Sequence, residues 1–169
     1  TVSATSGGSP YTVPVISESA AAPNTDINPD PHTVEVNIAA DETTVDIGGG
    51  VTADALAFNG TVPGPEFRLS PGDRVIVHFT NNLDSEHTGI HWHGIELANP
   101  MDGTPLTQNQ VAPGDSFLYD FVVPRPGVYW YHPHHEFSTN QVFKGLYGTI
   151  IVTDPNEPAL IGSGVLPDA

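Results

Sequence analysis

Cysteine is absent from the 169-residue sequence, and basic residues are scarce. Without thiols the chain can form neither a disulfide nor a thiolate metal site. Its only bases are Arg68, Arg74, Arg125 and Lys144, against 20 acidic residues, so the formal net charge is −16. A surface this acidic repels phosphate, which weighs against nucleic acid or anionic lipid as a partner.

Long apolar runs are also missing. No stretch approaches the ~20 residues of a membrane-spanning helix. A basic segment followed by an apolar segment, the pattern of an export signal, does not occur at the start either, so we expect any such signal to have been removed. The acidity is typical of a soluble secreted protein. We therefore expect an extracytoplasmic location, secreted or periplasmic.

Glycine and proline are abundant, with 17 of each. They separate short segments in which apolar and polar residues alternate, as in 34–38, 74–80 and 116–123. Alternation of this kind indicates strands with one buried face, and no apolar pattern of helical period runs far enough to compete. The sequence predicts an all-β sandwich or barrel of seven or eight strands. We expect a turn at Asp41-Glu42 and one short helical turn within 138–143.

The apolar pattern also predicts how the chain is divided. Residues 1–31 are rich in Ser, Thr, Ala, Gly and Pro, which predicts an extended arm or linker. The folded domain is expected to span 32–155, because Asp154-Pro155 stops the last apolar strand. Residues 156–169 are expected to form a C-terminal connector.

Two pairs of histidines stand out in aromatic segments. His91 and His93 flank Trp92, and His132 and His134 flank a proline. Residues i and i+2 of a strand project from the same face, and the residue before proline favours the extended conformation. Each pair is therefore expected to point one way. Four imidazoles without a thiolate or an interleaved carboxylate favour copper or zinc.

One His-X-His pair can be incidental, but two pairs among eight histidines favour a metal site. The other four histidines lie in less suggestive places. His78 falls on the polar side of a strand and is expected to be a surface or sheet histidine and not a ligand. His32 and His87 lie in polar turns and are expected to be solvated. His135 points away from His134 and is expected to support the site or lie at the surface rather than bind metal.

The two histidine segments, 91–94 and 130–134, resemble the two amino-terminal copper motifs of multicopper oxidases. This family includes laccases, ascorbate oxidase, bilirubin oxidase and bacterial copper-efflux oxidases. Several flanking segments match the same family's first domain: 58–65, 71–73, 81–83, 101–103, 107–108, 112–114, Gln141 and 145–148. The resemblance covers about 32–154. It implies a cupredoxin-like Greek-key sandwich or barrel, preceded by the extended arm.

The resemblance also implies a role for each site residue. His91 matches the histidine that binds the type 2 copper, and His93, His132 and His134 match ligands of the type 3 pair. Asp102 matches an acidic residue that helps to deliver protons to dioxygen. The alternative for Asp102 is a purely turn-forming Asp-Gly. Both tryptophans are expected to pack beside the ligands rather than carry electrons.

Half of the family's machinery has no counterpart in this sequence. The complete trinuclear cluster takes eight histidines, and the type 1 copper needs a cysteine thiolate. The resemblance therefore implies an oxidase fragment or subunit, active only with a companion chain or domain that carries a His-Cys-His motif. Dioxygen is the implied acceptor, and an oligomer is expected.

Two other interpretations remain open at this point. The chain could be a freestanding copper-binding, storage or delivery protein, in which two copies present eight histidines. It could also hold zinc or copper in a structural or hydrolytic role, although the sequence offers little support for that.

Overall fold

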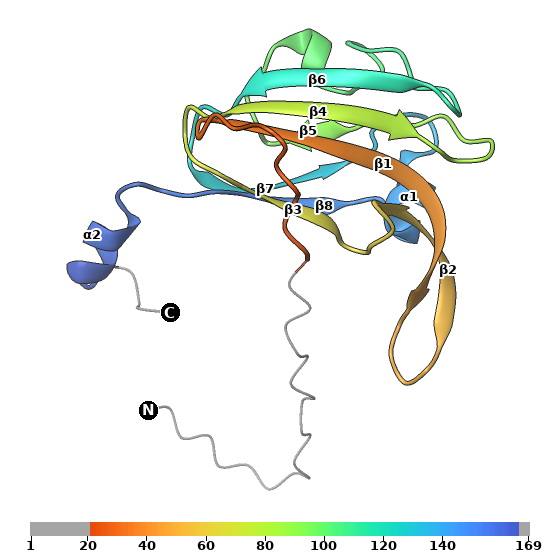
Figure 1. Cartoon of the computed structure of the whole chain (residues 1–169), viewed down its shortest axis with the longest axis horizontal. Helices are drawn as coiled ribbons and strands as arrows, with labels where there is room; N and C mark the ends of the chain where they lie inside the picture. Colours follow the sequence, from red (N-terminus) through yellow and green to blue (C-terminus); the bar gives the residue numbers. More distant parts are fainter. Residues whose placement is uncertain (1–20, 166–169) are drawn as a thin grey trace, which may run out of the picture.

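The structure is a computed structural model, and it describes residues 21–165 (Figure 1). Two four-stranded sheets make up the domain, with strand orders β2-β1-β4-β6 and β3-β8-β7-β5. The strands are β1 Thr33–Asp46, β2 Thr52–Phe58, β3 Gly64–Leu69, β4 Arg74–Asn81, β5 His91–His93, β6 Ser116–Val122, β7 Gly127–His132 and β8 Gly148–Val152. The short helical elements are η1 Asn99–Met101, α1 Ser138–Lys144 and α2 Glu157–Gly162. The predicted all-β fold and the helical turn after the second histidine pair are confirmed.

Strand alternation decides which side chains enter the core. On β4, Val75, Val77 and Phe79 have 0% exposure, while Arg74 and His78 face solvent. Buried side chains of this size stabilise a fold by roughly 1.5–3 kcal/mol each. The apolar faces of both sheets meet in one cluster, so the sheets pack as the two layers of a sandwich.

The predicted turn at Asp41-Glu42 is wrong. β1 runs straight through it, because the strand changes partner there: it pairs with β4 up to Ala40 and continues along β2 from Ala40 to Asp46. The hairpin of β1 and β2 therefore reaches beyond the body of the sandwich (Figure 1). Backbone pairing with β2 outweighs the local turn preference of two acidic residues.

β3 is not apparent from the sequence, because it begins with Gly64 and Pro65, two residue types that usually occur in turns. The strand tolerates Pro65 because it lies at the edge of its sheet, where one side of the backbone needs no neighbour. That open side is covered by the chain just before the domain. Asn24 N–H donates to the carbonyl of Glu66 (3.1 Å), and Glu66 N–H donates to that of Ala22 (3.0 Å).

The predicted division at 31/32 and 155/156 stays a prediction. Most of the proposed arm, residues 1–20, lies outside the described residues, while Ala22–Asn24 runs beside β3. Within the proposed connector, α2 was not predicted. Among residues 21–165, no helix is long and apolar enough to cross a membrane.

Candidate metal centre

Strands β5 and β7 bring the two histidine pairs together. They pair antiparallel, with His91 opposite His132, Trp92 opposite Tyr131, and His93 opposite Trp130. Residues directly opposite one another share a face of the sheet. His91, His93, His132 and Trp130 therefore all lie on the outer face, and Trp92 and Tyr131 point into the core.

The buried Trp92 fixes the direction in which its neighbours point. Its ring is 1% exposed and packs against the rings of Phe67, Tyr119 and Phe121, with centroid separations of 5.8, 5.4 and 4.8 Å. Each such aromatic pair adds about 0.5–1.5 kcal/mol beyond the burial of area. Slipping β5 by one residue would exchange Trp92 for histidine in the core, so the register that exposes His91 and His93 is strongly preferred.

Buried hydrogen bonds hold the backbone on either side of the histidines. Ile90 N–H donates to the Tyr119 hydroxyl at 2.8 Å, and burial raises the pKa of that hydroxyl to about 12. Tyr131 donates its hydroxyl hydrogen to the Pro65 carbonyl at 2.7 Å. Gln141 of α1 is fully buried, accepts from the Thr88 hydroxyl and donates to the His87 carbonyl. A buried polar group left without its partner costs about 1–3 kcal/mol, so these contacts resist distortion.

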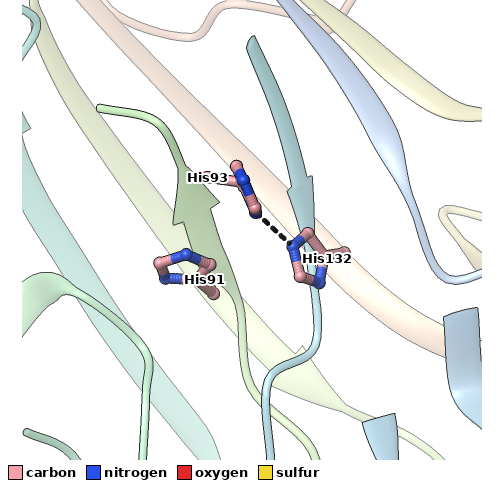
Figure 2. A group of neighbouring side chains, drawn as sticks. All are labelled: His91, His93 and His132. Atoms are coloured by element: carbon pink, nitrogen blue, oxygen red, sulfur yellow. Dashed lines mark hydrogen bonds between the residues drawn. The ribbon is translucent and has the colours of Figure 1, made fainter. Parts of the chain in front are cut away.

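Ring nitrogens of three histidines converge at this face (Figure 2). One nitrogen from each of His91, His93 and His132 lies within 4.8 Å of the other two. The closest pair is His93 Nδ1 and His132 Nε2, at 3.2 Å. Two nitrogens held about 2.0–2.1 Å from one ion at the tetrahedral angle lie about 3.3–3.4 Å apart. The pair is therefore spaced to bind a single ion.

Backbone carbonyls decide which nitrogen is free on two of these rings. His91 Nδ1 lies 2.7 Å from the Asp102 carbonyl, and His132 Nδ1 lies 2.7 Å from the Pro133 carbonyl. A carbonyl only accepts, so each Nδ1 carries the hydrogen and each Nε2 keeps its lone pair. Metal-binding histidines in proteins are oriented in this way.

Burial favours the neutral, metal-binding form of both rings. Burial lowers the pKa of His91, against the opposing effect of its hydrogen bond to the Asp102 backbone. Burial, together with repulsion from the neighbouring histidines, lowers the pKa of His132 to about 4. Both groups therefore keep a free lone pair at neutral pH.

The fourth predicted ligand, His134, lies beside this trio. Its ring centroid is 5.0 Å from that of His91 and 6.0 Å from that of His132, and its side chain is exposed. His135 points the other way and is 3% exposed, with no hydrogen-bond partner at either ring nitrogen. Burial lowers its pKa. Thus His135 lies behind the site and not at the surface.

Asp102 contacts His91 twice. Besides the backbone contact, its Oδ1 lies 3.7 Å from His91 Nδ1. The turn that places it depends on Gly103, which has φ +75° and sits so close to Ile90 that a Cβ would lie 1.7 Å from the Ile90 carbonyl oxygen. Only glycine fits there. Asp102 lies in a bend directly after η1, and this bend brings its carboxylate to the edge of the histidine group.

Trp130 packs against the histidine cluster. Its ring stacks on His132, with centroids 3.8 Å apart and planes inclined by 24°, and it lies 5.2 Å from His93. Strand alternation could have placed it there, since Trp130 and His132 are i and i+2 on one strand. The expectation that Trp130 packs beside the ligands is confirmed.

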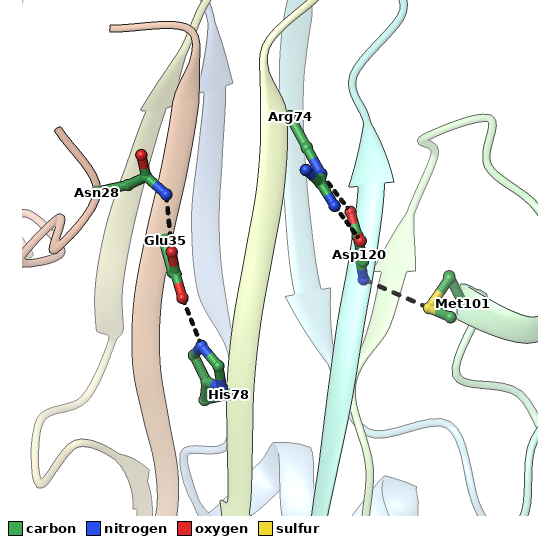
Figure 3. Close-up of polar contacts among 6 residues, drawn as sticks. All are labelled: Asn28, Glu35, Arg74, His78, Met101 and Asp120. Atoms are coloured by element: carbon green, nitrogen blue, oxygen red, sulfur yellow. Dashed lines mark hydrogen bonds and ion pairs between the residues drawn. The ribbon is translucent and has the colours of Figure 1, made fainter. Parts of the chain in front are cut away.

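The three histidines that were not expected to bind metal or support the site lie elsewhere. His78 is on the outer face of the other sheet, where Nε2 contacts Glu35 Oε1 at 2.7 Å (Figure 3). His32 has an 81% exposed side chain, and His87 is exposed. His32 and His87 are thus exposed, as predicted, and His78 is a surface histidine that lies apart from the converging ring nitrogens.

The part of the chain that contains these histidines also matches known proteins. A family model described as multicopper oxidase matches residues 39–157, more than half of the chain. The chain belongs to the multicopper oxidase family. It is 37% identical, over 153 residues, to the multicopper oxidase MmcO of Mycobacterium tuberculosis, covering 90% of this chain and 28% of that protein.

Solved structures agree with this assignment. A multi-copper oxidase from Pseudomonas thermotolerans superposes with a TM-score of 0.67 at 40% identity, covering 71% of this chain and 29% of that one. A laccase from Pediococcus acidilactici superposes with a TM-score of 0.74 at 28% identity, covering 83% and 30%. The chain thus spans less than a third of the length of these relatives.

Copper is the cofactor of the multicopper oxidase family, and the donor set fits it. The three converging side chains are imidazoles, and backbone carbonyls orient two of them. No carboxylate belongs to this group of described residues. Imidazole is a preferred ligand of copper.

Proposed function

We propose that this chain supplies one half of the trinuclear copper cluster of a multicopper oxidase that reduces dioxygen to water. The convergence of His91, His93 and His132 from two adjacent strands is the observation that carries the proposal. His91 would bind the type 2 copper, and His93, His132 and His134 the type 3 pair. Bound copper would pass electrons that come from the reducing substrate to dioxygen.

The protein frame would do three things for that site. β5 and β7 hold the rings on a rigid sheet face, and the carbonyls of Asp102 and Pro133 keep the lone pair of His91 and of His132 on Nε2. Trp130 covers one face of His132 and restricts its rotation. Rigid placement reduces the entropy lost when an ion is bound.

Asp102 is proposed to pass protons to the site. Reduction of one dioxygen to two waters consumes four protons, so an acid–base group must lie close by. The Asp102 carboxylate is 28% exposed and lies 3.7 Å from His91 Nδ1. It therefore has access both to solvent and to the edge of the histidine cluster.

The other half of the site is proposed to come from a companion chain or domain. This chain has no cysteine for a type 1 copper, and the relatives are more than three times as long as the part it matches. The companion would carry the His-Cys-His motif and receive electrons from the reducing substrate. A laccase-like or metallo-oxidase activity, in an extracytoplasmic compartment, completes the proposal.

Co-expression with the proposed companion tests this directly. Purified native material should contain a second polypeptide, or additional sequence, with a His-Cys-His motif, and the assembly should consume oxygen with a reducing substrate. The isolated chain should consume none. A native preparation of this chain alone that binds copper without oxygen uptake would instead favour the freestanding copper-binding protein.

A further inference from the structure

We infer that the isolated chain binds a single divalent ion through His91, His93 and His132 before any companion ligand arrives. The inference rests on the proposed ligand assignment but goes beyond it. In the complete cluster His91 serves a different copper from His93 and His132. The isolated chain, by contrast, brings these three together and leaves His134 to one side.

The nitrogen spacing supports one shared ion. His93 Nδ1 and His132 Nε2 already lie 3.2 Å apart, and no pair among the three ligand atoms exceeds 4.8 Å. Two ligands on one ion lie about 3.3–3.4 Å apart at the tetrahedral angle, and roughly 4.0–4.2 Å when they face each other. Ring movements on the order of 1 Å, by small side-chain rotations, would close the set.

The electrostatics of the site favour the same event. The chain as a whole carries a net charge of −16, which attracts cations. His93 is exposed, so the ion has an open route from solvent and an open coordination position.

His134 differs from the trio in its surroundings. Among the described residues it lies outside the group of three converging ligands, and its closest aromatic neighbour is the His91 ring at 5.0 Å. Once companion ligands are present, His91 would release this first ion and bind a second one, the type 2 copper, while His93 and His132 would keep the first. The isolated chain would thus be a one-ion intermediate in loading the cluster.

Titration of the isolated, metal-free chain with Zn(II) and with Cu(II) tests this inference. Native mass spectrometry and calorimetry should give one ion per chain. His91→Ala should weaken binding by at least about 100-fold, more than is typical for loss of an outer hydrogen-bond partner. His134→Ala should weaken it by no more than about threefold, since that ring lies outside the trio. The Cu(II) electron paramagnetic resonance spectrum should show coupling to three nitrogens.

His78→Ala is the matched control, because it removes a histidine from the other sheet and should leave binding unchanged. Circular dichroism of every variant separates lost ligands from lost folding, and His91→Gln provides a better-filled replacement. Two ions per chain, no binding, or equal losses in His91→Ala and His134→Ala would overturn the inference. Any of these results would leave the proposed oxidase intact, because oxygen uptake is measured on the assembly with its companion.

Discussion

The two sheets each carry histidine on their outer face, and the surroundings of those histidines differ. On the first sheet His78 contacts Glu35, Glu35 also accepts from Asn28, and Arg74 forms two hydrogen bonds to Asp120 (Figure 3). On the second sheet the rings of His91, His93 and His132 face one another (Figure 2). The histidine of the first sheet is paired with a carboxylate, whereas the converging nitrogens of the second sheet form a group that could hold an ion.

The contrast extends to charge. The hydrogen bond with His78 lowers the pKa of Glu35, and the hydrogen bonds from Arg74 lower that of Asp120, so both carboxylates are ionised at neutral pH. On the second sheet burial lowers the pKa of His91 and of His132, which keeps both rings uncharged. One face is therefore a solvated polar surface, and the other is prepared for a cation.

The largest effect should follow from His93→Ala, which removes a ligand from the closest nitrogen pair. We expect oxygen reduction by the assembled oxidase to fall by more than about 100-fold, beyond the range for an outer-sphere partner. The magnetic coupling of the type 3 pair should be lost, which magnetic susceptibility measures. Preserved turnover in a folded variant would contradict the ligand assignment.

A smaller effect is expected from Asp102→Asn, which keeps the shape and the backbone contact to His91 but removes the carboxylate. Copper content should stay the same, while oxygen reduction slows by about 100-fold, at the low end of proton-transfer contributions. The pH–rate profile should change as well, which a structural role for the turn would not produce. Unchanged turnover would leave Asp102 as a turn residue only.

The smallest effect is expected from His78→Ala on the first sheet. Copper stoichiometry, oxygen uptake and the thermal unfolding midpoint should all match the unchanged protein, because an exposed pair with Glu35 contributes little to stability. A marked loss of copper in this variant would mean that the first sheet also takes part in metal binding. The distinction between the two faces would then fail.

The sequence alone was sufficient for the fold class, the two histidine pairs and the family. The alternation of apolar and polar residues in 74–80 and 116–123 indicates which side of each strand is buried. In the same way, His91 and His93 must point away from the core, because Trp92 between them is buried in it. Short-range patterns of this kind depend only on strand geometry. The same alternation places His78 on the polar face of its strand, which distinguished it from the candidate metal ligands.

Tertiary structure decided what depends on partners distant in sequence. The antiparallel pairing of β5 and β7 places His91 opposite His132, a residue 41 positions away in the sequence. Pairing with β2 keeps β1 extended at Asp41-Glu42, where a turn was predicted. β3 became a strand because β8 and the segment Ala22–Asn24 pair with it. A short stretch of sequence does not reveal such pairings, because the hydrogen bonds of a sheet join segments that are far apart along the chain. For that reason the two histidine pairs could be found in the sequence. Only the fold shows that ring nitrogens of three of them converge and that His134 lies outside this group.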